Sequence, residues 1–194
     1  MKMKATATLA LAAIALAAVP AFAQVQISRD GRPEKIFRPI SGLNTMDVHF
    51  LREAAIINLF EIKSSQLAGE KSSNAFVTEY AKEMIADHQM AFAELKEIAE
   101  SKGVSLPQDL PPDLMRLYRH LENQSGTTFD AAYQNAQRSG HANASNEFKG
   151  EIENGKDEDV KAFAVKTLPT VEMHYRMMLT QTTMMGSTKM DHGN

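Results

Sequence analysis

Residues 73–103 have the sequence SNAFVTEYAKEMIADHQMAFAELKEIAESKG, which carries the clearest structural pattern in the chain. Its apolar side chains recur in steps of three and four, at Val77, Ala81, Met84, Ala91, Leu95 and Ile98. An α-helix turns once in 3.6 residues, so this spacing gathers them on one face. His88 lies on that face as well, and Gly103 stands where a left-handed residue closes a helix. The segment therefore predicts a long amphipathic helix with a histidine on its buried side.

The same spacing recurs in three other long segments. They cover residues 44–69, 127–155 and 157–184. Asn44 with Asp47, and Thr127 with Asp130, form capping pairs at the start of the first two segments. Three acids at residues 157–159 open the last one, where the helix dipole favours negative charge. Each segment therefore predicts a long amphipathic helix.

The connection between the second and third long helices is about twenty residues, well beyond the usual 2–8 residues. Pro107, Pro111 and Pro112 exclude regular structure from its first half, and a short amphipathic segment follows at residues 114–121. A connection this long lets the third long helix start at the far end, as in ferritin-like proteins. The sequence thus predicts an all-α fold, a ferritin-like four-helix bundle with a short extra helix in this connection. The bundle domain is expected over residues 44–184, followed by a flexible Met- and His-containing tail over residues 185–194.

The N-terminal residues have the pattern of an export signal. Lys2 and Lys4 precede an apolar run at residues 9–19, and Ala21 and Ala23 flank Phe22 in a small-x-small cleavage pattern. We expect residues 1–23 to be a signal peptide, cleaved near Ala23, and residues 24–43 to be a flexible lead-in. The protein is then periplasmic or secreted. No second apolar run follows, so the mature chain is predicted to have no integral membrane span.

Composition excludes several functional classes. The chain has 194 residues, a formal charge of −3 and no cysteine. The lack of cysteine excludes disulfides, a thiolate zinc site and a cysteine nucleophile. The acidic balance argues against nucleic acid as a partner, and leaves a protein partner or an oligomer open. A Gly-x-Ser-x-Gly elbow is absent, and the sequence assigns no enzymatic reaction.

Three of the six histidines, His88, His141 and His174, lie inside long predicted helices. Because the helical rise is constant at about 1.5 Å per residue, counting from each helix start places all three near mid-bundle, whichever way the helices run. Glu61 is deep in its own helix as well. Imidazole and carboxylate groups bind zinc, iron, manganese or copper. Glu61, His88, His141 and His174 are therefore the predicted ligands of a divalent transition metal.

Two other interpretations remain open. In the first, the protein is a purely structural or interaction module, and its histidines are core residues hydrogen-bonded to Asn58, Glu61 or a tyrosine. In the second, six methionines between Met173 and Met190, together with His192, make a periplasmic Cu(I)-binding protein, because thioethers are soft donors. Adaptable core packing also accounts for such methionines.

Several stretches resemble the exported bacterial family called domain of unknown function 4142. They are FLREAA at residues 50–55 with Asn58 and Glu61, YAKEMIADH at residues 80–88, FDAAY at residues 129–133, His141, and Leu168-Pro169 with His174. The resemblance implies a ferritin-like fold and export, and no settled activity. Ferritin-like di-metal proteins carry Glu-x-x-His on two helices, whereas Ile85 and Val171 stand three residues before His88 and His174 here. We therefore expect an exported binding or envelope-stress protein whose metal site is mononuclear or a His-rich variant, rather than a di-iron oxidase.

Overall fold

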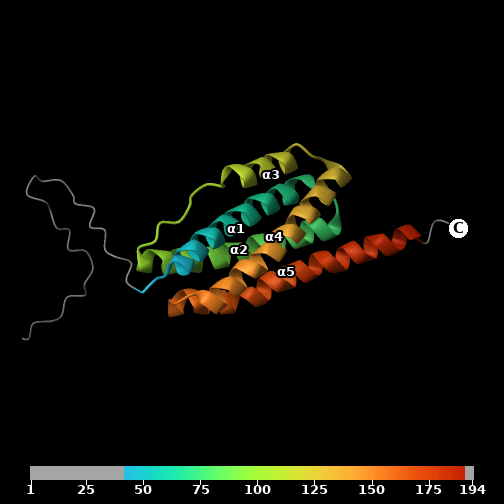
Figure 1. The fold of residues 1–194 in the computed structure, drawn as a ribbon. Coiled ribbons are helices and arrows are strands. Elements are labelled where there is room, and N and C mark those ends of the chain that lie inside the picture. Colours follow the sequence, from blue (N-terminus) through green and yellow to red (C-terminus); the bar gives the residue numbers. More distant parts are fainter. Residues whose placement is uncertain (1–41, 191–194) are drawn as a thin grey trace, which may run out of the picture. The chain divides into compact units, whose positions relative to one another are not determined.

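The chain is helical throughout most of the part that the structure describes, which is residues 42–190 of a computed structural model, with side chains placed up to residue 181. The five helices are α1 (Thr45–Lys71), α2 (Ala75–Lys102), α3 (Pro112–Glu122), α4 (Gly126–Asn154) and α5 (Glu158–Met190) (Figure 1). No strand occurs among these residues, so the predicted all-α class is confirmed. Four helices are long, and the short α3 lies between the second and third of them, as the sequence predicts.

Local sequence signals determine where α1 and α2 begin and where α2 ends. Asn44 and Asp47 form the predicted capping box, in which each side chain accepts a hydrogen bond from the backbone N–H of the other. The Asn74 side chain caps α2 in a similar position. Gly103 ends α2 with a φ of 70°, in the left-handed conformation that favours glycine. These three boundaries follow from single residues.

The predicted capping pair of Thr127 and Asp130 is wrong. Helix α4 begins at Gly126, after the N-cap residue Ser125, whose side chain makes no capping hydrogen bond. Asp130 instead accepts a hydrogen bond of 2.6 Å from the hydroxyl of Ser72, just beyond the end of α1. A partner from another helix has thus replaced the local one, and the bond ties the start of α4 to the end of α1.

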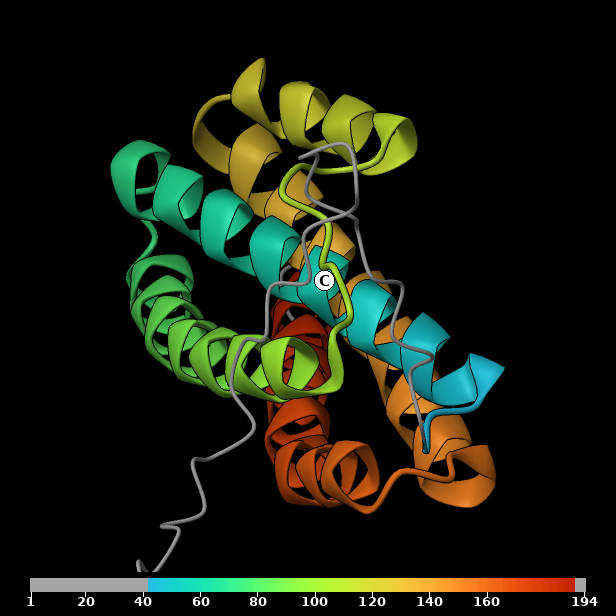
Figure 2. The same cartoon turned by 90° about the vertical axis from the view of Figure 1, so that its left-hand side faces the viewer.

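Polar contacts at one end of the domain show how the helices are ordered. Asn44 Nδ2 donates to Asn154 O at 3.0 Å, and Lys102 Nζ pairs with Asp157 at 2.8 Å. The starts of α1 and α5 therefore lie at the same end as the C-termini of α2 and α4. Helices α1 and α5 run one way and α2 and α4 the other, as Figures 1 and 2 show. The connection with α3 carries the chain back along the domain, so that α4 starts at the opposite end.

The buried apolar residues form two separate clusters. The largest members of the first are Phe50, Leu51, Leu95, Phe148 and Phe163. The largest members of the second are Phe60, Tyr80, Met84, Phe129, Tyr133 and Met178. All four long helices contribute to both clusters. The core is therefore divided along the helix axes into two apolar blocks.

Polar residues lie at the boundary between the two blocks. In α2, for example, Met84 belongs to one cluster and Ala91 packs against the other, with the buried His88 between them. Buried polar residues occupy the corresponding place in the other three long helices. They are Asn58 in α1, Gln137 and His141 in α4, and His174 in α5. A polar layer thus crosses the domain at mid-depth.

Several predictions fall outside the described residues. The signal segment at residues 1–23 lies there, with residues 24–41 of the lead-in and residues 191–194 of the tail. Helix α5 continues to Met190, past residue 184 where the bundle was expected to end. Among the described residues, no helix is both long and apolar enough to cross a membrane.

The structure describes the side chains of the first methionines of α5 and not those of the last ones. Met178 is buried in the second apolar cluster, and Met177 packs against that cluster. These two residues therefore serve core packing. The side chains of Met184, Met185 and Met190, on which a Cu(I) site in the tail would depend, lie outside the described residues.

Candidate metal centre

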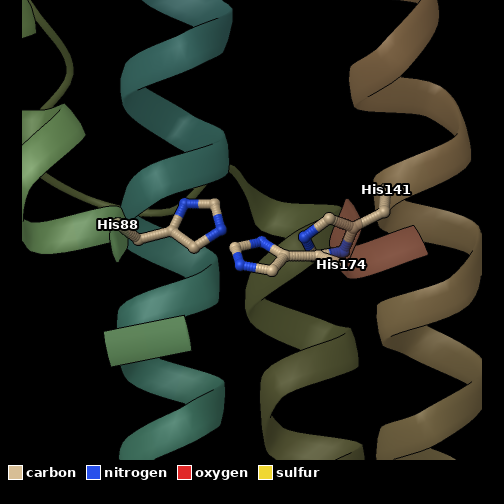
Figure 3. Close-up of side chains that lie close together, drawn as sticks. All are labelled: His88, His141 and His174. Atoms are coloured by element: carbon tan, nitrogen blue, oxygen red, sulfur yellow. The ribbon is translucent and has the colours of Figure 1, made fainter. Parts of the chain in front are cut away.

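His88, His141 and His174 meet in the polar layer, each from a different helix (Figure 3). The ring centroids are 5.8 Å apart for His88 and His141, 5.7 Å for His88 and His174, and 5.3 Å for His141 and His174. One ring nitrogen from each residue lies within 4.8 Å of the other two. Exposure is 6% for His88 and 1% for the others. The predicted convergence of the three imidazoles inside the domain is confirmed.

Each ring is held by one hydrogen bond to an oxygen. His88 Nδ1 lies 2.9 Å from Asn58 Oδ1, and the amide of Asn58 is oriented by its own donation to Ala54 O. His141 Nδ1 lies 2.9 Å from Gln137 O, one turn earlier in α4.

The third ring is also held by one hydrogen bond to an oxygen, because His174 Nε2 lies 3.0 Å from Asp87 Oδ2. Amide, backbone and carboxylate oxygens only accept hydrogen bonds, so the proton sits on the bonded nitrogen of each neutral ring. The other nitrogen of each ring therefore carries a lone pair.

These remaining nitrogens are buried and have no hydrogen-bond partner. They are His88 Nε2, His141 Nε2 and His174 Nδ1. A water molecule has two hydrogens, so it can donate to at most two of the three lone pairs. A metal ion accepts all three at once. The donor set of this layer thus matches a cation more closely than it matches water.

The three rings are neutral at physiological pH. Burial, followed by the neighbouring His141 and His174, holds the pKa of His88 well below its usual value. Burial also lowers the pKa of His141, to about 4. Burial lowers the pKa of His174 as well, although the hydrogen bond to Asp87 opposes the change. Neutral imidazole is the form that binds metals, so no proton has to leave before an ion binds.

The three nitrogens are close enough together for one ion to bind all of them after small movements. At the upper limit of their spacing, 4.8 Å, an ion equidistant from the three would lie about 2.8 Å from each, whereas zinc–nitrogen bonds are about 2.1 Å. Each nitrogen therefore has to move by about 0.7 Å at most to reach bonding distance.

Glu61 lies beside the cluster and not inside it. Its Oε1 is 4.0 Å from His141 Nδ1, the nitrogen already bonded to Gln137 O. Among the described residues, neither group of potential ligands includes Glu61. Burial raises the pKa of Glu61 to about 8, although its hydrogen bond with Gln137 opposes the change. Gly140 provides the space for this carboxyl, because a Cβ there would lie 3.1 Å from Oε1. Glu61 is a buried, neutral neighbour of His141, and its direct binding of a metal stays a prediction.

A pocket of about 210 Å³ leads into the layer between α2 and α5. His88 and His174 line its inner part, and Thr167 and Thr170 of α5 line it nearer the surface. His141 does not line this pocket. The cluster can therefore be approached from the side of α2 and α5.

One protein family matches most of the chain, over residues 39–180. The chain belongs to the family Domain of unknown function (DUF4142). Its resemblance to this family, seen in the sequence, is thereby confirmed. No curated protein matches this DUF4142 chain.

Two solved structures are similar to this DUF4142 chain, and both are DUF305 proteins. A DUF305 fragment from Deinococcus radiodurans is 12% identical, with a TM-score of 0.63 over 71% of this chain and 95% of that one. A DUF305 protein from Streptomyces coelicolor, described as secreted, is 14% identical, with a TM-score of 0.59 over 69% and 89%. At these identities the similarity shows a shared fold.

The sequence does not reveal all the residues that support the cluster. Asp87 precedes His88 in the chain, and its partly exposed carboxylate holds His174 on another helix. Glu83, Asp87 and His174 also offer ligand atoms within 4.8 Å of one another. The spacing of Glu83 and Asp87, one turn apart on α2, is the signal that could have indicated this pair.

Proposed function

We propose that this DUF4142 protein is an exported, ferritin-like four-helix bundle that binds one divalent transition-metal ion through His88, His141 and His174. The supporting observation is the set of three buried lone pairs without partners. An unpaired buried polar group costs about 1–3 kcal/mol, and a whole domain is stable by only about 5–15 kcal/mol. One ion bound by all three nitrogens removes this cost.

The donor chemistry narrows the choice of ion. Three neutral imidazoles with no thiolate suit zinc and copper(II), and also iron, better than they suit manganese. Glu61 contributes a carboxyl group next to His141. A positive ion nearby favours its charged form, so binding is accompanied by release of a proton from Glu61.

Export belongs to the proposal. Lys2 and Lys4, the apolar run at residues 9–19 and the cleavage pattern at Ala21 and Ala23 support it, and one structurally similar protein is described as secreted. In the periplasm or outside the cell, a mid-domain site of this kind serves metal binding or the response to envelope stress.

Metal content and affinity test the proposal. Purified protein is stripped with a chelator, titrated with zinc or copper(II) by calorimetry, and examined by elemental analysis. We expect about one ion per chain, and a loss of affinity of more than about 100-fold in His88→Ala, since even second-shell changes cost 10–100-fold. His120→Ala is the matched control, because His120 is exposed on α3. Equal, near-zero metal content in wild type and His88→Ala contradicts the proposal.

A structural module is the second candidate function, because every ring of the cluster has one hydrogen bond within the core. The two candidates differ in thermal melting. If the histidines only stabilise the core, added metal shifts the melting temperature of wild type no more than that of His88→Ala. If they bind an ion, metal at 100 times the Kd stabilises wild type alone, by about 2.7 kcal/mol.

A further inference from the structure

The pocket between α2 and α5 reaches the cluster from one side only. Its lining includes His88 and His174, but not His141. His88 is also the most exposed of the three rings, at 6%. An ion bound by the three nitrogens would therefore face the open pocket on the side of α2 and α5. On the side of His141, Glu61 and Gly140 line a second pocket, which none of the three histidines lines.

The protein supplies three ligands and no obvious fourth one. In the part of the chain that the structure describes, the group that contains His88, His141 and His174 includes no acidic residue within 4.8 Å of all three nitrogens. Sites with three protein ligands typically keep one coordination position for water or substrate, whereas structural zinc sites are closed by four ligands. The donor count indicates an open site.

Charge indicates what the open position takes. A divalent ion with three neutral imidazoles carries two positive charges. The acidic side chains around it are Asp87, which is bonded to His174, Glu83, which offers a ligand atom within 4.8 Å of both, and Glu61, which is next to His141. A net positive charge buried in a medium of low dielectric constant is costly. These acidic residues can balance the charge of the ion, so the open position takes either a neutral ligand such as water or a small anion.

We propose that the ion keeps an open coordination position facing the pocket between α2 and α5, and that this position takes a small exogenous ligand, such as water, hydroxide or a small inorganic anion. This inference rests on the proposed function. The pocket volume of about 210 Å³ is several times the share of one water molecule, about 30 Å³. It admits a ligand of a few atoms.

Cobalt(II) and azide test the inference. Cobalt(II) is loaded into the full protein as a visible-absorbing substitute, and azide is then titrated while the absorption bands of the metal are recorded. We expect saturable changes in the bands with one azide per cobalt. Bound cobalt whose bands do not respond to azide overturns the open position and leaves the proposed function intact. A protein that binds no cobalt overturns the proposed function itself.

A substitution in the pocket tests whether azide reaches the ion through it. Thr170→Phe places a ring in the pocket one turn before His174, and we expect normal cobalt binding with azide affinity lowered at least about tenfold. Val165→Phe is the matched control on the same helix, because Val165 is 55% exposed and lies outside the pocket lining. If Thr170→Phe fails to fold, Thr167→Phe takes its place. If a cobalt-loaded pocket variant binds azide as tightly as wild type does, azide does not reach the ion through this pocket, and this part of the proposal is wrong.

Discussion

The hydrogen bond between Asp87 and His174 determines which nitrogen of that ring faces the cluster. Asp87 Oδ2 accepts from His174 Nε2 at 3.0 Å, which leaves Nδ1 with its lone pair. We predict that Asp87→Asn lowers metal affinity by about 10–100-fold, because the amide no longer fixes the tautomer or raises the basicity of the ring. Calorimetric titration with zinc measures the change. Glu97→Gln, an exposed position on the same helix, is the control, and equal affinity in both variants contradicts the orienting role of Asp87.

The buried carboxyl of Glu61 makes the stability of the metal-free protein depend on pH. Burial raises its pKa to about 8 from an ordinary value of 4.5. The folded state therefore holds a proton that the unfolded state has lost, and stability falls as pH rises from 4.5 through 8. We predict that Glu61→Gln removes up to about 5 kcal/mol of this loss between these limits. Urea unfolding at several pH values measures it.

A matched variant separates this effect from general charge effects. Glu70→Gln changes an exposed residue of the same helix and should leave the pH dependence unchanged. Burial also raises the pKa of Glu151 to about 8. This residue is present in wild type and in both variants, so its effect on the pH dependence of stability is the same in all three. Parallel stability curves for wild type and Glu61→Gln above pH 6 would show that Glu61 is ionised in the folded protein.

Among the helices, the first turn of α1 has a role beyond capping. Asp47 is fully buried, and its Oδ1 accepts from the backbone N–H of Lys156 at 2.7 Å and of Asp157 at 3.2 Å, in the turn between α4 and α5. Burial opposes ionisation of Asp47, but the N–H groups of Asn44, Lys156 and Asp157 together hold its pKa below the usual value. This carboxylate joins the start of α1 to the α4–α5 turn.

We predict that Asp47→Ala costs about 3 kcal/mol or more, because three backbone N–H groups lose their acceptor. Asn44→Ala, which removes the other half of the capping box, should cost about 1 kcal/mol. Denaturant unfolding of both variants measures the difference. Because the pKa of Asp47 is lowered, its contribution is present at neutral pH and is lost as pH falls through the folded-state pKa. Equal losses in the two variants would mean that Asp47 acts only as a cap.

The sequence predicts the helices better than it predicts which side chains contact one another in the histidine cluster. The apolar period gave all four long helices, and the constant rise per residue placed His88, His141 and His174 at one depth, because depth does not depend on helix rotation. The partners do depend on rotation, which changes by about 100° per residue. The pairing of Asp87 with His174 on another helix, and the place of Glu61 beside the cluster, could therefore not be derived from spacing.

In the whole molecule, the polar layer separates two apolar clusters that would otherwise form one continuous core. Continuous apolar packing is often more stable than a buried polar layer. A protein that keeps such a layer gives up stability, and under the proposed function the binding of an ion by the three unpaired nitrogens offsets that loss. A structural role for the same histidines predicts the opposite, since the layer would then contribute to stability.

The triple substitution Asn58→Leu, His88→Leu and His141→Leu separates these two possibilities. It removes both partners of the Asn58–His88 hydrogen bond, leaves His174 with Asp87, and joins the two clusters through apolar side chains. We predict that the metal-free triple variant is more stable than metal-free wild type by about 1–4 kcal/mol and no longer binds zinc. Denaturant unfolding with and without zinc measures both effects. A destabilised variant whose circular dichroism shows an intact helical fold would mean that the histidines hold the two halves of the core together, and that metal binding is not why the layer is polar.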